Sequence, residues 1–232
     1  MPPAPEHPLA HNPHFVAVLD RLHALSLAQE VAGDARGAHF PTGPDGKLLF
    51  EEQLVALDEN KCAAMYLILR AMGARRIVEA GTSYGVSLLW ILAAVTDTPV
   101  PAGSLPSVVY ATENEPKKAA LAFTHVREAF GGVLPQELSL LEGDLLQTLP
   151  NASIVDRSID CMLLDIWAPL ALPTLKIMLP KLRIGAVVFI DNTVCSAARY
   201  EDLLNFLRDP ANGFITTTLP HSGGFEMCLF TG

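Results

Sequence analysis

The stretch that decides the fold of this sequence is Arg76-Ile77-Val78-Glu79-Ala80-Gly81-Thr82-Ser83-Tyr84-Gly85-Val86-Ser87. Ile77 and Val78 favour a short buried strand. Gly81 allows a sharp turn, because glycine adopts backbone angles that other residues avoid. Thr82 and Ser83 are favourable N-cap residues for the apolar helix expected next. The pattern therefore predicts a strand, a glycine turn and a helix, and the carboxyl end of such a strand is the usual ligand site of an open α/β sheet.

Two features of this turn bear on the ligand that it holds. Gly81 and Gly85 have the spacing G-x-x-x-G, whereas a dinucleotide site carries G-x-G-x-x-G. Glu79 comes two residues before the first glycine, where a carboxylate would repel a pyrophosphate. A carboxylate would instead suit a ligand with a positive charge, such as an amino-acid ammonium or a sulfonium. The other interpretation is an ordinary strand-turn-helix with a solvated Glu79.

Length and composition indicate one main domain with an N-terminal extension. The chain has 232 residues and is 50% hydrophobic, which suffices for a sizeable core. We expect an extension over residues 1–50, made of a proline-rich start, a helix and a loop, and a main domain over residues 51–232. The net charge of −9 argues against a nucleic-acid partner, which would need clustered Lys and Arg.

Other features of the sequence bear on where the protein works. The longest apolar runs are far too short to span a bilayer, and the N-terminus has no apolar segment of the signal-peptide kind. The four cysteines, Cys62, Cys161, Cys195 and Cys228, are scattered without a C-x-x-C motif. They are typical of free, mostly buried thiols in a reducing compartment. We therefore expect a cytoplasmic protein with no membrane partner.

The chain alternates between apolar strands and helices. A first helix is expected over 13–30, a loop over 33–47, and a second helical stretch over 50–73, with a break near Asp58 and Gly73 as its C-cap. Five strands are expected at 76–80, 107–112, 137–141, 160–164 and 186–190, with helices at 83–95, 115–130, 171–183 and 198–208. Two last strands, 214–219 and 225–230, flank a hairpin-turn signal. This order predicts an α/β fold: a Rossmann-like, doubly wound, mostly parallel seven-stranded sheet with a C-terminal antiparallel hairpin strand and an N-terminal helical extension.

Mostly polar and acidic residues follow all five parallel strands, where ligands collect in such a sheet. They are Glu79 and Gly81, Glu113 and Asn114, Gly143 and Asp144, Asp165 and Trp167, and Asp191 and Asn192. A single acid in such a position is more often a helix N-cap or a solvated residue. Because all five strands end this way, a shared site is the better explanation.

The side chains in this set suggest individual roles. Glu113 can accept two hydrogen bonds from a ribose diol, a placement that dinucleotide sites share. Asp144 can accept a hydrogen bond from an exocyclic amine such as that of adenine. Asp165, Asp191 and Asn192 offer three hard oxygen ligands, which suit Mg²⁺ or Ca²⁺. They do not make a zinc site, because no His or Cys joins them.

The segment from Lys61 to Asn192 resembles the catechol O-methyltransferase-like family of cation-dependent enzymes, within the class I S-adenosylmethionine-dependent methyltransferases. The matching pieces are Val-Glu-Ala-Gly-Thr-Ser-Tyr-Gly-Val-Ser, Ala-Thr-Glu-Asn, Glu-Gly-Asp, Leu-Leu-Asp-Ile-Trp and Phe-Ile-Asp-Asn, the last being the most family-specific. The C-terminal hairpin extends the match and departs from dinucleotide-binding sheets. The resemblance implies methyl transfer from S-adenosylmethionine to a hydroxyl of a small molecule, with the methyltransferase domain over residues 51–232.

The resemblance also implies which residues bind the cofactor. The set is Leu57, Glu79, Gly81, Thr82, Ser83, Gly85, Ser87, Glu113, Asn114, Gly143, Asp144, Asp165 and Trp167. In the family, the position of Glu113 holds the ribose and the glycine turn holds the methionine moiety. Leu57 falls where a backbone contact to the amino-acid part is expected, and Ser87 aligns with a serine that binds its carboxylate. Trp167 matches an aromatic on the adenine side; the other interpretation is a plain core aromatic.

One departure from the family concerns catalysis. The resemblance implies that Asp165, Asp191 and Asn192 hold the divalent cation, Mg²⁺ or Ca²⁺, which makes Asp165 a catalytic candidate. The family's general base is a lysine three residues after the first metal aspartate, and here that position is Ala168. Three explanations compete: the cation alone activates the acceptor hydroxyl, His221 in the C-terminal turn acts as base, or the substrate is no catechol and the metal is weak or absent.

Three other functions stay open at this stage. One is a dinucleotide-dependent oxidoreductase, against which Glu79 and the glycine spacing argue. Another is a non-catalytic S-adenosylmethionine-binding protein, which the missing lysine suggests. The third is metal-independent methylation of a nitrogen or a carboxylate. The N-terminal helix needs either the main domain or a second subunit to cover its apolar face, and we therefore also expect a homodimer.

Overall fold

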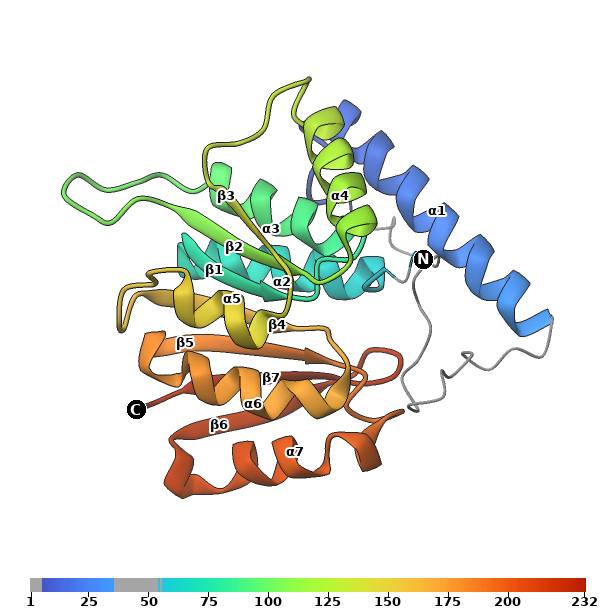
Figure 1. Cartoon of the computed structure of the whole chain (residues 1–232). Helices are drawn as coiled ribbons and strands as arrows, with labels where there is room; N and C mark the ends of the chain where they lie inside the picture. The colour runs from blue at the N-terminus through green and yellow to red at the C-terminus, as the bar shows by residue number, and fades with distance from the viewer. Residues whose placement is uncertain (1–5, 36–53, 55) are drawn as a thin grey trace.

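The sheet of the computed structural model has the strand order β3-β2-β1-β4-β5-β7-β6 (Figure 1). The structure describes residues 6–35, 54 and 56–232, so most of the loop expected over 33–47 lies outside the described residues. The strands are β1 (Arg76–Ala80), β2 (Val108–Glu113), β3 (Leu138–Glu142), β4 (Ile159–Leu164), β5 (Leu182–Asp191), β6 (Phe214–Leu219) and β7 (Phe225–Phe230). The first five are parallel, and β7 runs antiparallel to β5 and β6. The predicted fold class and C-terminal hairpin are confirmed.

Helices cover both faces of this sheet (Figure 1). One face is covered by α2 (Glu59–Met72), α3 (Val86–Thr96) and α4 (Pro116–Ala129), and the other by α5 (Leu145–Asn151), α6 (Ala168–Met178) and α7 (Glu201–Arg208). Successive strand residues alternate between the two faces. In β1, for example, Ile77 belongs to the core beneath α2 and α3, and Val78 to the core beneath α5 and α6. Because both faces are covered, apolar residues stand at consecutive positions in the parallel strands.

The helix after the glycine turn begins later than the sequence predicts. It starts at Val86 instead of residue 83. Ser83 has φ of 49° and Gly85 has φ of 88°, and residues in this left-handed region cannot continue a right-handed helix. Gly85 is the N-cap residue, and the Thr82 hydroxyl donates to Glu79 instead of capping the helix. The N-cap role expected of Thr82 and Ser83 is therefore wrong.

Two further helices differ from the expectation. Helix α5 has no predicted counterpart, because its seven residues, Pro150 among them, are too few to show a helical period. Helix α6 begins at Ala168, so Pro169 lies in its first turn and Pro173 in its interior. The expected break at Pro180 is present, as a short 3₁₀ turn over Leu179–Lys181.

The N-terminal helix α1 (Pro13–Ala35) packs against its own chain. Phe15, Val18, Leu19 and Leu22 are buried in the core that α3 and α4 also line, and Figure 1 shows α1 running beside α4. Because the apolar face of α1 is covered within the chain, it gives no reason to expect a second subunit. The homodimer stays a prediction.

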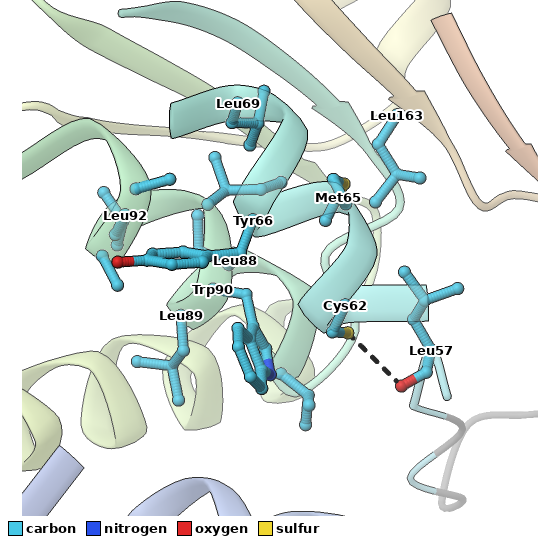
Figure 2. Close-up of a cluster of buried hydrophobic side chains, with 14 of the residues drawn as sticks. Leu57, Cys62, Met65, Tyr66, Leu69, Leu88, Leu89, Trp90, Leu92 and Leu163 are labelled. Carbon is cyan, nitrogen blue, oxygen red and sulfur yellow. Dashed lines mark hydrogen bonds between the residues drawn. The ribbon is translucent and has the colours of Figure 1, made fainter. Parts of the chain in front are cut away.

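Helix α2 packs against α3 through a cluster of buried side chains (Figure 2). Met65, Leu69 and Trp90 are fully buried, and the Tyr66 ring meets the Trp90 ring edge-on with centroids 5.9 Å apart. Residues four apart lie on one face of a helix, so Lys61 follows Met65 and Leu69 into this buried side. The packing of α2 thus brings one lysine to the interior.

Two smaller expectations can be compared with the structure. All four cysteines are free; Cys195 is exposed and the other three are buried. Over the ranges that the structure describes, none of the helices combines the length and the apolar character needed to cross a membrane.

Replacing Leu69 by alanine tests how α2 is packed. Leu69 is fully buried, whereas Leu67 on the same helix is 56% exposed. We expect Leu69→Ala to lower the free energy of unfolding by about 2–5 kcal/mol, because it leaves a cavity. The control Leu67→Ala should change it by less than about 0.5 kcal/mol. Urea unfolding followed by circular dichroism measures both, and equal effects would contradict this packing.

Candidate functional site

The carboxyl ends of four neighbouring strands line up in one row of the sheet. Ala80 of β1 is paired with Thr112 of β2 and Leu164 of β4, and Leu164 is paired with Ile190 of β5. The next residue along each strand completes a row, which reads Glu113, Gly81, Asp165 and Asp191. Four residues singled out in the sequence therefore lie side by side.

The side chains of this row share the face that α2, α3 and α4 cover. Leu163 and Phe189 belong to the core on that face, and residues two apart in a strand point to the same side. Asp165 and Asp191 therefore lie on this side too. Glu79 is paired with Leu163 and joins them. The site is thus built between the ends of the strands and the helices of one face only.

The turn between β1 and α3 approaches β4 closely. Gly81, Ser83 and Gly85 all have positive φ, of 92°, 49° and 88°. A Cβ atom on Gly81 would lie 2.1 Å from the carbonyl oxygen of Asp165. Only glycine permits this approach, because any side chain at residue 81 would overlap the end of β4.

Glu79 is fully buried beneath this turn. Its carboxylate accepts hydrogen bonds from the hydroxyls of Thr82 and Ser87, both at 2.6 Å. Burial raises the pKa of Glu79 to about 7, although the two hydroxyls oppose this, and the charge of Glu113 raises it further. A cation bound nearby would favour the ionised form. The interpretation of Glu79 as a solvated residue is wrong, and the geometry suits a positively charged ligand.

The same hydrogen bonds bear on Ser87. A hydroxyl carries one donor, and Ser87 donates it to Glu79. Its expected contact with a cofactor carboxylate would require that bond to break, and the contact stays a prediction.

Glu113 fixes the turn with both of its carboxylate oxygens. Oε2 accepts the backbone N–H of Ser83 at 2.7 Å, and Oε1 accepts that of Glu115 at 2.8 Å. A carboxylate offers about four lone-pair positions, so about two remain for a diol. The expected ribose contact is compatible with this geometry, while Ser83 contributes its amide to the site.

The third strand end lies beside Glu113. The Gly143 amide donates to the Glu113 carbonyl oxygen at 2.8 Å. The Asp144 carboxylate caps α5 by accepting from the Leu146 amide at 2.9 Å. Asp144 and Asn114 are both exposed. Asp144 is therefore a helix N-cap in this structure, and its accessible carboxylate is also placed to accept from a ligand amine.

Leu57 and Trp167 occupy different environments. Leu57 is buried, and its carbonyl oxygen accepts a weak hydrogen bond from the Cys62 thiol at 3.5 Å (Figure 2). Trp167 is 39% exposed at the N-terminus of α6. Its interpretation as a plain core aromatic is wrong, and its contact with adenine stays a prediction.

Two of the three residues expected to hold a divalent cation, Asp191 and Asn192, are engaged with other groups. Asp191 Oδ1 accepts from the Lys61 ammonium at 2.7 Å, and Oδ2 accepts from the Asn192 amide at 3.0 Å. The side-chain oxygen of Asn192 accepts from the Cys195 thiol at 3.3 Å. Within the described ranges, no group of three His, Cys, Asp or Glu is arranged to hold a metal ion. The donor set as folded does not fit a divalent cation.

Sequence reasoning missed two residues of this site. Lys61 is 2% exposed. The sequence signal for it is its spacing of four and eight residues from the apolar positions 65 and 69 of α2, which places a lysine on the buried face of the helix. A buried lysine needs a charged partner, and this would have pointed to a nearby acid. The Thr112 hydroxyl donates to the Glu79 carbonyl oxygen at 3.1 Å and accepts the Gly81 amide at 3.2 Å. Nothing in the sequence marks Thr112, because its role depends on the pairing of β1 with β2.

The carboxylates beside Lys61 influence one another. Burial raises the pKa of Asp165, and the charges of Asp191 and Glu79 raise it further while Lys61 opposes them. Burial also raises the pKa of Asp191, against the hydrogen bond and charge of Lys61. Lys61 is therefore the cation that balances this end of the sheet.

His221 lies in the turn between β6 and β7 and packs edge-on against Phe225, with ring centroids 5.9 Å apart. The turn is joined to the segment after β5, because the backbone N–H of Asn192 donates to the Gly224 carbonyl oxygen at 3.0 Å. His221 thus lies at the edge of the sheet where β5 ends in Asp191. Its role as a base stays a prediction.

Residues 78–193 match the family described as "Methyltransferase domain". This span is half of the chain and holds the glycine turn together with Glu113, Asp165 and Asp191. No curated protein matches the sequence.

Solved structures show the same fold at low identity. The O-methyltransferase TomG of Streptomyces achromogenes, in complex with SAM, is 23% identical over 76% of this chain and 82% of that chain, with a TM-score of 0.65. The SAH-bound methyltransferase PaMTH1 of Podospora anserina is 16% identical over 93% and 88%, with a TM-score of 0.67. An O-methyltransferase of Bacillus cereus in complex with SAH is 18% identical over 93% and 91%, with a TM-score of 0.62.

Replacing Gly81 by alanine tests the close approach of the turn to β4. Gly81 and Gly103 both have positive φ, of 92° and 78°, but a Cβ on Gly103 would meet nothing within 4 Å. We expect Gly103→Ala to lower the free energy of unfolding by about 1–2 kcal/mol through backbone strain. Gly81→Ala should cost about 1–3 kcal/mol more, since it also overlaps the Asp165 carbonyl. Urea unfolding compares the two, and equal losses would rule out the contact.

Proposed function

The chain belongs to the family of methyltransferase domains, and we propose that it transfers a methyl group from S-adenosylmethionine to a hydroxyl oxygen of a small molecule. The observation that carries the proposal is the buried Glu79 carboxylate beneath the glycine turn. A carboxylate in this place favours a ligand with a positive charge, and Glu113 at the end of the next strand keeps lone pairs that suit a ribose diol. The net charge of −9 favours a small molecule over a nucleic acid as the acceptor.

On the cofactor side, the chain supplies charge and shape. When bound, S-adenosylmethionine supplies a methyl group on a positively charged sulfur. Glu79 provides the compensating negative charge, since its ionised form is held by Thr82 and Ser87. The absence of side chains at Gly81 and Gly85 lets the turn pack against the Asp165 carbonyl and Ala122, and the positive φ angles of the two glycines give the turn the shape proposed to receive the ligand. Glu113 orients the nucleoside through the oxygen lone pairs that the backbone leaves free.

On the acceptor side, the chain supplies a cationic group. Lys61 donates a hydrogen bond to Asp191 at the end of β5. In the row of strand ends, Asp191 is two strands away from Gly81. A fixed ammonium favours an acceptor that develops negative charge, as a hydroxyl does, over an amine. Two of the three neighbours described above carry the name O-methyltransferase, which supports oxygen as the acceptor atom. The rate then depends on holding this oxygen in line with the methyl carbon.

The resemblance adds a divalent cation at Asp165, Asp191 and Asn192. The side chains of Asp191 and Asn192 are engaged with Lys61, Cys195 and each other. The mechanism proposed here therefore takes no step from a metal ion.

Replacing Glu113 by glutamine tests the cofactor site. We expect wild type to bind S-adenosylmethionine and S-adenosylhomocysteine, and Glu113→Gln to bind both roughly 10- to 100-fold more weakly. The reason is the loss of charge-assisted hydrogen bonds, each worth about 1.5–3 kcal/mol. Calorimetric titration with and without Mg²⁺ measures this.

Glu201→Gln is the matched control, because Glu201 is an exposed carboxylate in the first turn of α7, on the opposite face of the sheet. It should bind as wild type does. Binding would justify a screen of methyl acceptors, beginning with phenols and vicinal phenols. No binding of either ligand by wild type would sink the proposal and direct attention to nicotinamide and flavin cofactors.

Cofactor binding should also depend on pH through Glu79. Its pKa of about 7 in the free protein means that the carboxyl is largely protonated below neutrality. A cationic ligand prefers the ionised form, so its binding lowers this pKa and releases a proton. Affinity should therefore rise by up to about tenfold per pH unit as pH increases towards 7, and level off above it.

Titrations at several pH values between 5.5 and 7.5, in buffers of different ionisation enthalpy, report affinity and proton release together. Glu79→Gln cannot ionise, so its weaker affinity should not vary with pH over this range. A pH-independent affinity of wild type would refute the role of Glu79.

A further inference from the structure

A buried lysine lies where the resemblance places a divalent cation. The Lys61 ammonium is 2.7 Å from Asp191 Oδ1 and 2.8 Å from Asp58 Oδ2. Asp58 immediately precedes α2, and Asp191 ends β5. The side chain of Lys61 is 2% exposed. Two carboxylates from distant parts of the chain therefore fix one ammonium at the end of the sheet.

A metal ion and this ammonium would compete for the same carboxylate oxygen. Mg²⁺ and Ca²⁺ bind oxygen at about 2.0–2.6 Å, and Asp191 Oδ1 already accepts from Lys61 at 2.7 Å. The two cations would lie less than about 6 Å apart and repel each other. The second oxygen of Asp191 accepts from the Asn192 side-chain amide, so both oxygens already have a donor. The arrangement fits a lysine and does not fit a divalent ion.

The ammonium keeps a donor for a ligand. A lysine ammonium has three N–H donors, and Asp58 and Asp191 accept two of them. In the part of the chain that the structure describes, the ammonium makes ion pairs and hydrogen bonds with Asp58 and Asp191 alone, so the third N–H has no acceptor there. Its partner Asp191 lies next to Asp165 in the row of strand ends, and Asp165 lies next to Gly81, so the ammonium is held one strand beyond the end of β4.

We infer that the Lys61 ammonium takes the place of the divalent cation, binds the acceptor oxygen through its third N–H, and allows methyl transfer without a metal ion. This inference rests on the proposed function. An ammonium is a compact point donor, whereas a metal ion can chelate two oxygens at once. The acceptor class is therefore a compound with one hydroxyl or phenol at the reacting position, with no need of a second oxygen beside it.

The step balances without a further reactant. The acceptor oxygen forms a bond to the methyl carbon, the carbon–sulfur bond breaks, and its electron pair stays on sulfur. The hydroxyl proton passes to water. Lys61 stabilises the negative charge that develops on the oxygen and is unchanged at the end.

Calcium and manganese titrations of the full chain test this inference without any acceptor. Wild type should show no binding by calorimetry and no rise in melting temperature with either ion. Lys61→Gln leaves Asp58 and Asp191 without their cation, and it should gain ion binding with a dissociation constant of roughly 10⁻⁴ to 10⁻³ M, as in weak carboxylate sites. Lys117→Gln is the control, because Lys117 is exposed and also lies in the first turn of a helix; it should gain none.

Two results would overturn the inference. One is ion binding by wild type that Asp191→Asn abolishes, since the site would then be a metal site. The other is a folded Lys61→Gln that gains no ion binding. Should Lys61→Gln fail to fold, the wild-type titration decides alone, and Lys61→Arg, which keeps the positive charge, should fold and bind neither ion.

The same samples separate this inference from the proposed function. Wild type that binds S-adenosylmethionine equally well with and without EDTA supports both. Wild type that binds no S-adenosylmethionine contradicts the proposed function, whatever the metal result. Once an acceptor is found, EDTA should leave turnover unchanged, and Lys61→Arg should retain more activity than Lys61→Gln. Turnover that EDTA abolishes would overturn the inference while leaving the methyltransferase proposal in place.

Discussion

The burial of the Glu79 carboxylate is the constraint on which the rest of the site depends. A buried carboxylate is costly unless hydrogen bonds satisfy it, and here the hydroxyls of Thr82 and Ser87 do so. These two residues stand on either side of the turn, so the turn must bend around Glu79 before α3 can begin. That bend requires the positive φ angles of Gly81 and Gly85. The same bend presents the Ser83 amide to Glu113, which ties the second strand end to the first.

The sequence predicts those parts of the site that depend on neighbouring residues. Apolar runs place the strands, and the acids that follow them fall into one row because parallel strands end at one edge. The family match to residues 78–193 confirms the methyltransferase resemblance that the same motifs indicate. The late start of α3 is not predictable in this way, since it follows from the positive φ angles of Ser83 and Gly85, which the turn adopts only in the folded chain. Lys61 and Thr112 act through partners in other elements, and their roles follow from packing and strand pairing.

The position of the positive charge is the main difference between this site and the one that the resemblance implies. The family carries a lysine after the fourth strand, where this chain has Ala168. Here the lysine comes from α2, on the other side of Asp191, and it is held by Asp58 as well. A cation beside clustered carboxylates favours their ionised forms, and Lys61 opposes the rise in the pKa of Asp165 that burial, Asp191 and Glu79 cause. Helix α2 supplies this cation, so the packing of α2 is part of the site.

Stability alone does not account for such a pair. Removing an ammonium and a carboxylate from water costs much of what their attraction returns, and apolar residues of similar volume often replace a buried ion pair without loss. Met65 and Leu69 on the same side of α2 show that this part of the core accepts apolar side chains. A lysine one turn before them, ion-paired with Asp191 at the end of β5, is better explained by the ligand contact proposed for it. The fold supplies the rigid helix and strand that hold the charge, and the chemistry follows from where they place it.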